Sequence, residues 1–133
     1  TTLTNSGLMT ALITKWIEKG TAAQLLSAIR EELLERQKIA KDILGDTHCS
    51  HPEGPHVWLK LPDWWSSIDF VSYARKQGLG LAPSGVFTVE GEPPQRVRIA
   101  LGSATTRENL ENSLRGIADL MSRKKILGFE NIV

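Results

Sequence analysis

Two six-residue segments, 56–61 and 96–101, have an aliphatic residue at every second position, and this alternation most constrains the fold. A period of two places the apolar residues of each segment on one face of an extended strand. These residues are Val57, Leu59 and Leu61 in the first segment and Val97, Ile99 and Leu101 in the second. A strand with one apolar face needs a cover, and four segments have apolar residues at helical spacing. Their order predicts an α+β fold, a small, mainly antiparallel sheet with helices packed on one face, preceded by a long N-terminal helix.

The helical segments carry recognisable start and stop signals. Ser6 is a candidate N-cap for a helix over 8–19, and Thr21 with Gln24 forms a capping-box pattern for a helix over 21–44. The longer helix has an apolar stripe made of Leu26, Ile29, Leu33, Ala40 and Ile43. Its other face carries Glu31, Glu32, Glu35, Arg36, Lys38 and Lys41. We expect this charged face to be solvated, and the alternative is a face that binds a partner.

The remaining elements are shorter. Residues 46–55 are polar and contain two prolines and a glycine, which predicts a loop. Ser66 and Asp69 begin a short helix that Gly78 stops, and a strand over 79–82 leads into a hairpin-like stretch with Val86, Phe87 and Val89. Thr105 and Glu108 predict a capping box for the last helix, whose stripe contains Leu110, Leu114, Ile117 and Met121.

The composition indicates one domain, residues 1–133, in the cytoplasm. A length of 133 residues suits a single domain, and a net charge of +1 argues against a basic grip on nucleic acid within this segment. The sequence has neither an apolar run of about 18 residues nor the pattern of a signal peptide. Its single cysteine excludes an intrachain disulfide and is typical of a reducing compartment.

Four possible metal ligands lie close together in the sequence: His48, Cys49, His51 and His56. Nitrogen and sulfur ligands within nine residues can in principle hold zinc, but the spacing matches no standard zinc pattern. A water-exposed loop is therefore the favoured interpretation, and we assign no metal site. The sequence also contains no G-x-S-x-G nucleophile motif, P-loop or G-x-G-x-x-G, so we assign no catalytic residue.

Two arginines and two tryptophans are candidates for ligand contacts. Arg96 and Arg98 share one face of an alternating strand, where a guanidinium can bind a carboxylate at two points. The alternative is an ordinary exposed strand face. Trp64 and Trp65 can stack on a ligand or partner, although such aromatics more often pack against a neighbouring layer.

Five stretches together resemble a known family. They are IREE at 29–32, RQKIA at 36–40, HVWLKLP at 56–62, APSGVF at 82–87 and VRIALG at 97–102. Their order and spacing resemble the C-terminal small domain of class I/II aminotransferases of fold type I. The closest resemblance is to the MocR branch of GntR-type transcriptional regulators, which join a winged helix-turn-helix to an aminotransferase-like domain. The resemblance extends over nearly the whole chain.

The resemblance implies a pyridoxal 5'-phosphate protein in which this domain contributes to the ligand site. Arg98 matches the arginine that binds the α-carboxylate of an amino-acid substrate or effector, and Arg96 has no such match. Pro83, Ser84 and Phe87 match a loop near the substrate pocket.

The family's aldimine lysine and the groups that hold its cofactor lie upstream, in a large domain. We therefore expect an excised domain that does not bind the cofactor alone. Its implied partners are the large domain of the same chain, an amino acid, DNA through a helix-turn-helix, and a second copy in a homodimer. A genuine aminotransferase and an independent α+β interaction module, with 21–44 as its binding face, are the alternatives. Whether the longer protein catalyses transamination is left open.

Overall fold

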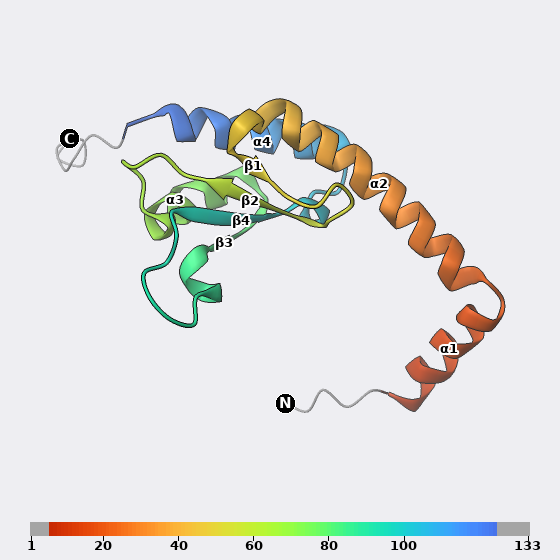
Figure 1. Ribbon diagram of the computed structural model, residues 1–133. Helices are drawn as coiled ribbons and strands as arrows, with labels where there is room; N and C mark the ends of the chain where they lie inside the picture. The colour runs from red at the N-terminus through yellow and green to blue at the C-terminus, as the bar shows by residue number, and fades with distance from the viewer. Residues whose placement is uncertain (1–5, 125–133) are drawn as a thin grey trace. The chain divides into compact units, whose positions relative to one another are not determined.

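The computed structural model describes residues 6–124 and confirms the α+β class (Figure 1). The helices described are α1 (Gly7–Glu18), α2 (Thr21–Leu44), α3 (Ser67–Ala74) and α4 (Arg107–Ser122). The strands described are β1 (His48–Cys49), β2 (His56–Lys60), β3 (Gly80–Pro83) and β4 (Arg96–Ala100). The chain divides into two compact units, one up to Glu32 and one from Leu33 onward. Between residues 6 and 124, no helix is long and apolar enough to cross a bilayer.

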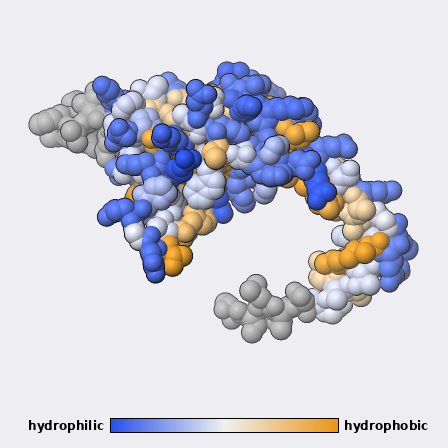
Figure 2. All heavy atoms as spheres, viewed as in Figure 1, coloured by the Kyte–Doolittle hydropathy of each residue, from blue (hydrophilic) through white to orange (hydrophobic). Residues whose placement is uncertain are grey.

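The first unit contains α1 and the first half of α2, and its apolar side chains are exposed. No residue of α1 is buried. The exposed apolar residues of this unit are Leu8, Met9, Leu12, Ile13, Trp16, Ile17, Leu25, Leu26 and Ile29. Figure 2 shows apolar surface along this helical part of the chain. The predicted helices therefore form, but the apolar stripe from residue 8 to residue 29 lies at the surface of the unit.

The second unit is built on a four-stranded sheet in the order β1-β2-β4-β3, with antiparallel pairing throughout. Val57 pairs with Ile99 and Leu59 with Val97, and all four side chains are fully buried. They pack against residues of α3, α4 and the C-terminal end of α2, which lie beside the sheet in Figure 1. The core residues from these helices are Ala40, Leu44, Phe70, Val71, Ala74, Leu110, Leu114, Ile117 and Met121. Helices therefore cover one face of the sheet, as the alternation predicts.

Two connecting segments differ from their predictions. Residues 48–49, expected within a loop, form the edge strand β1, in which Cys49 pairs with Trp58. A two-residue strand is too short to show alternation, so the sequence pattern misses it. The hairpin-like stretch around Val86 and Val89 contains no strand, because Ser84–Phe87 form a 3-10 turn and both valines are exposed.

The helix starts follow the predicted signals with small shifts. Ser66 caps α3 as expected, because the Asp69 backbone N–H donates to its hydroxyl at 3.1 Å. For α4 the N-cap is Thr106 rather than Thr105, and its hydroxyl accepts from the Asn109 backbone N–H at 3.0 Å.

The capping signals at the first two helices are wrong in detail. Ser6 does precede α1, but its side chain makes no capping bond. Thr21 is the first residue of α2 rather than the residue before it, and the carbonyl of Gly20 accepts from the Gln24 N–H.

Arg36 is buried, although its charge places it on the predicted solvated face of α2. Its residue exposure is only 8%. Its Nη1 donates to the carbonyls of Leu101 at 2.7 Å and Ala104 at 2.8 Å. These carbonyls belong to the connection between β4 and α4, where the chain has left the sheet. A buried arginine is stable here because its donors meet backbone acceptors.

Candidate functional site

The face of the sheet opposite the helices carries the site that the sequence predicts. On β2 and β4 the residues of this face alternate with the buried ones. They are His56, Trp58, Lys60, Arg96, Arg98 and Ala100. Trp58 lies directly across from Arg98 on one side, and Ala82 of β3 lies across from it on the other. Arg98 is therefore held on a central strand that is hydrogen-bonded along both edges.

Arg98 stacks on Phe87, and Trp58 packs against Phe87. The Cζ atom of Arg98 lies 4.3 Å from the centroid of the Phe87 ring. The ring of Trp58 meets the same phenyl ring edge to face, with centroids 5.4 Å apart. Stacking on an aromatic face restrains a guanidinium while leaving its in-plane N–H donors free to bind an anion. Of the predicted site residues, Arg98 and Phe87 are thus brought into direct contact.

Pro83 and Ser84 support the site rather than line it. Pro83 is the last residue of β3 and pairs with Val97. Ser84 is buried, and its hydroxyl donates to the carbonyl of Pro94 at 2.5 Å. This bond ties together the two ends of the connection from residue 84 to residue 95, which carries Phe87. We infer that Ser84 acts on the site by shaping this connection.

The electrostatics of this face favour an anion. The pKa of His56 is lowered by burial and, to a smaller extent, by the positive charge of Arg98. Within residues 6–124, no acidic side chain forms an ion pair with Arg98. A guanidinium that stacks on an aromatic ring and pairs with no carboxylate in this described part of the chain is suited to bind one. No local sequence pattern marks Trp58 as part of the site, because its place opposite Arg98 depends on strand register.

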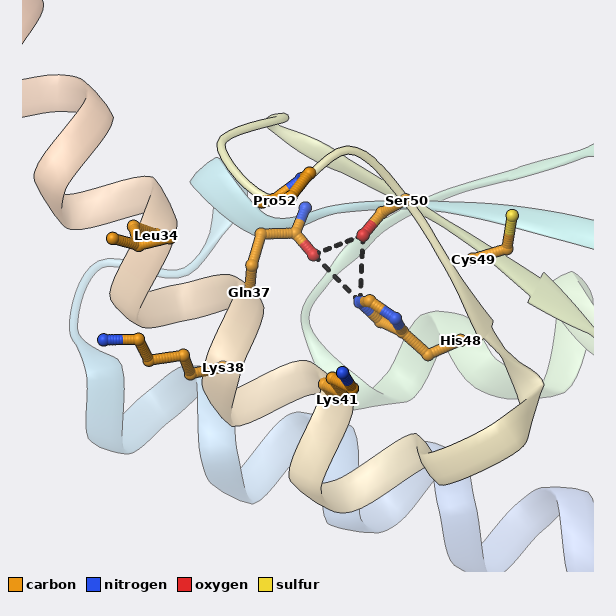
Figure 3. A pocket seen from close by; sticks show the side chains of 8 residues that line it. All are labelled: Leu34, Gln37, Lys38, Lys41, His48, Cys49, Ser50 and Pro52. Carbon is orange, nitrogen blue, oxygen red and sulfur yellow. Dashed lines mark hydrogen bonds between the residues drawn. The ribbon is translucent and has the colours of Figure 1, made fainter.

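A second feature of this unit is a cavity of about 500 Å³ between α2 and the chain around β1 (Figure 3). Its lining residues are Leu34, Gln37, Lys38, Lys41, His48, Cys49, Ser50 and Pro52. The amide nitrogen of Gln37 donates to the carbonyls of Gly54 at 2.6 Å and His56 at 3.2 Å. This fixes the amide, so that the oxygen of Gln37 is left to accept hydrogen bonds from other side chains.

The oxygen of Gln37 joins Ser50 and His48 into a closed triangle. The Ser50 hydroxyl donates to it at 2.6 Å, and His48 Nε2 lies 2.9 Å from it and 3.0 Å from the Ser50 oxygen. Because the amide oxygen of Gln37 can only accept, its contact with Nε2 assigns the proton to Nε2. The pKa of His48 is lowered by burial first and by the Lys41 ammonium second. The Ser50 hydroxyl donates its hydrogen bond to the amide oxygen of Gln37 rather than to a histidine base, so the triangle ties α2 to the sheet edge and activates no nucleophile.

The four possible metal ligands are committed to different environments. His48 is held in the triangle, and His51 Nδ1 accepts from the Glu53 backbone N–H at 3.2 Å. Cys49 is exposed, and His56 lies on β2 opposite Ala100. In the part of the chain that the structure describes, no three His, Cys, Asp or Glu side chains gather as a metal-binding group. These residues give no support to a zinc site.

The two neighbouring tryptophans divide between packing and exposure. Trp65 is buried, donates its indole N–H to the carbonyl of Arg123 at 3.1 Å and meets the rings of Phe70 and Tyr73. Trp64 is exposed, and the ammonium of Lys124 lies 5.8 Å from its ring. Packing is therefore the role of Trp65, and neither ring lies on the Arg98 strand.

The lysines do not fit a pyridoxal-phosphate site. Every lysine among residues 6–124 is exposed, whereas a lysine that forms a Schiff base needs desolvation or a cationic neighbour that activates it. Lys125 lies outside the described residues. We therefore derive no cofactor chemistry from this chain.

Comparisons with protein-family models, with curated proteins and with solved structures find no match for this chain. A functional assignment therefore depends on its own residues and their arrangement.

Proposed function

We propose that this domain binds the α-carboxylate of an amino acid through Arg98. It does so as the C-terminal small domain of a pyridoxal-phosphate-dependent, aminotransferase-like regulator of the MocR type. The observation that carries the proposal is the Arg98 guanidinium, held against Phe87 on a central strand without an ionic partner among the described residues. Such a group is organised in advance for a carboxylate, because little side-chain freedom is lost on binding. The ordered resemblance of five sequence stretches supports the same assignment.

The cofactor belongs to another domain in this proposal. Pyridoxal phosphate, when bound there, supplies an aldehyde that reacts with the amino group of the ligand. The residues of this chain bind and orient the carboxylate end of that ligand. The Phe87 ring, on which the guanidinium stacks, restrains it while leaving its in-plane donors for the anion.

The apolar surface of the first unit supports a larger assembly. A stripe of exposed apolar side chains from residue 8 to residue 29 favours contact with another protein surface. We assign this contact to the large domain of the same chain. The longer protein would be a cytoplasmic homodimer that binds DNA through an N-terminal helix-turn-helix and responds to its amino-acid effector.

Two alternative functions agree with these observations. A genuine class I/II aminotransferase uses the same arginine and lacks the helix-turn-helix, so the sequence upstream of this domain separates it from a regulator. An independent interaction module is favoured by the exposed apolar stripe alone. It predicts that Arg98 has no effect on any small ligand.

Ligand titrations of the full-length protein test the proposal. Arg98→Gln should weaken amino-acid binding by at least about 30-fold, because truncating one partner of a charge-assisted pair costs about 2–5 kcal/mol. Cofactor affinity, followed by its visible absorbance, should change little. Arg115→Gln is the matched control, since Arg115 is exposed on α4 and pairs with Glu111 at 2.6 Å. Equal loss of cofactor and amino acid in Arg98→Gln, or no loss of either, would contradict the assigned role.

A further inference from the structure

The face that carries Arg98 also carries a second pair of cations. Lys60 on β2 lies directly across from Arg96 on β4, one alternate position along the strands from the pair of Trp58 and Arg98. Lys60 is exposed and Arg96 is half-buried. Since side chains two residues apart on a strand project from the same face, Arg96 and Arg98 start about 7 Å apart.

The pairing of Lys60 with Arg96 is unfavourable for the isolated sheet. Like charges directly opposite on neighbouring antiparallel strands repel, whereas opposite charges at such positions stabilise the pair. Of the acidic residues described in residues 6–124, none forms an ion pair with Lys60 or Arg96. This holds even for Glu90 and Glu92, which are exposed in the connection that leads into β4.

The repulsion is relieved when an anion lies between the two side chains. An ammonium and a guanidinium on facing strands provide donors from two directions, as a carboxylate requires. The ring of Phe87 beside Arg98, with Trp58 against it, adds apolar surface to the same face of the sheet. A ligand with two carboxylates would therefore find a cation for each of them on this one face of the sheet.

We propose that Lys60 and Arg96 form a second anion subsite beside Arg98, so that the preferred ligand is an acidic amino acid with two carboxylates. This inference rests on the proposed function, in which Arg98 binds the α-carboxylate. The side-chain carboxylate then accepts hydrogen bonds from Lys60 and Arg96. A neutral amino acid of the same length fills the same space but leaves the second pair of cations uncompensated.

The test compares glutamate with glutamine on the full-length, cofactor-loaded protein. The two ligands share the α-carboxylate and the chain length and differ in the side-chain charge. We expect the unmodified protein to bind glutamate at least 10-fold more tightly than glutamine. The double substitution Lys60→Gln with Arg96→Gln should lower glutamate affinity about 10-fold or more and change glutamine affinity less than 2-fold. Arg115→Gln, which removes a distant charge, should leave both affinities unchanged.

Thermal unfolding separates an effect on binding from an effect on folding. Lys60→Gln alone removes the repulsion at an exposed position, so its melting temperature should equal or exceed that of the unmodified protein. It should still reduce the preference for glutamate. If the double variant unfolds, this single variant decides the question.

Each other outcome has a distinct meaning. Equal binding of glutamate and glutamine by the unmodified protein overturns the second subsite and leaves the role of Arg98 intact. An equal loss of both ligands in the Lys60 and Arg96 variants also overturns it, because these residues then serve the shared part of the ligand. If no amino acid binds and Arg98→Gln changes nothing, the proposed function itself fails.

Discussion

Replacement of Arg36 by methionine should destabilise the second unit by about 3 kcal/mol or more. Its Nη1 donates to two carbonyls, of Leu101 and Ala104, at 2.7 and 2.8 Å. Hydrogen bonds to a charged group contribute about 1.5–3 kcal/mol each, so the additive loss is about 3–6 kcal/mol. One nitrogen makes both bonds, and the two contributions overlap, which favours the lower end of this range. Methionine fills most of the same space but leaves both carbonyls without this donor.

The assay is urea unfolding of the 133-residue chain, followed by tryptophan fluorescence, because the ring of Trp65 is buried in the second unit. With a denaturant slope of roughly 1–3 kcal/mol per molar, the midpoint should fall by about 1–3 M. Lys38→Met is the matched control on the same helix. Its exposed ion pair with Glu35, at 2.6 Å, contributes about 0–1 kcal/mol. A midpoint for Arg36→Met within the range of this control would refute the reasoning.

Three further predictions concern the same unit. Thr106→Ala should cost about 1 kcal/mol of stability through loss of the α4 N-cap, and Thr105→Ala distinctly less; equal losses in urea unfolding would contradict the assignment of the cap. Leu114→Ala should cost about 2–5 kcal/mol, because its fully buried side chain leaves a cavity, and a loss under 1 kcal/mol would show that the core closes around the gap. Burial and Lys41 lower the pKa of His48 below 6.5, so the unfolded chain binds the proton more tightly than the folded one. Stability should therefore be highest above pH 6.5 and decrease as the pH falls below it, and His48→Gln should reduce this slope in unfolding experiments from pH 7.5 to pH 5.

Periodicity was sufficient to predict the centre of the fold. The alternating segments became β2 and β4, with Val57, Leu59, Val97 and Ile99 fully buried. The prediction is right for these residues because burial on one side of a strand imposes a period of two on the sequence. Capping signals were less reliable, since Thr105 and Thr106 are adjacent residues with the same side chain and only the backbone path distinguishes them.

The features that sequence reasoning missed depend on contacts between distant segments. The charge of Arg36 predicts a surface position. Its burial depends on the two carbonyls that accept its hydrogen bonds, and these lie 65 and 68 positions away in the sequence. Trp58 enters the site only through the register of β2 with β4. The contact of Phe87 with Arg98 follows from the path of the connection after β3, which no local pattern specifies.

Arg98 and Phe87 are held by different parts of the structure. Arg98 sits on a strand bonded on both edges, so the sheet fixes the position of its backbone. Phe87 sits on a connection whose two ends are joined by the bond from Ser84 to Pro94, away from the hydrophobic core. Substitutions between residues 85 and 93 can therefore accumulate during divergence, or be introduced by design, without altering the strand that holds the arginine. Under the proposed function, residues of this connection can change which ligands are preferred while Arg98 keeps its place on the strand.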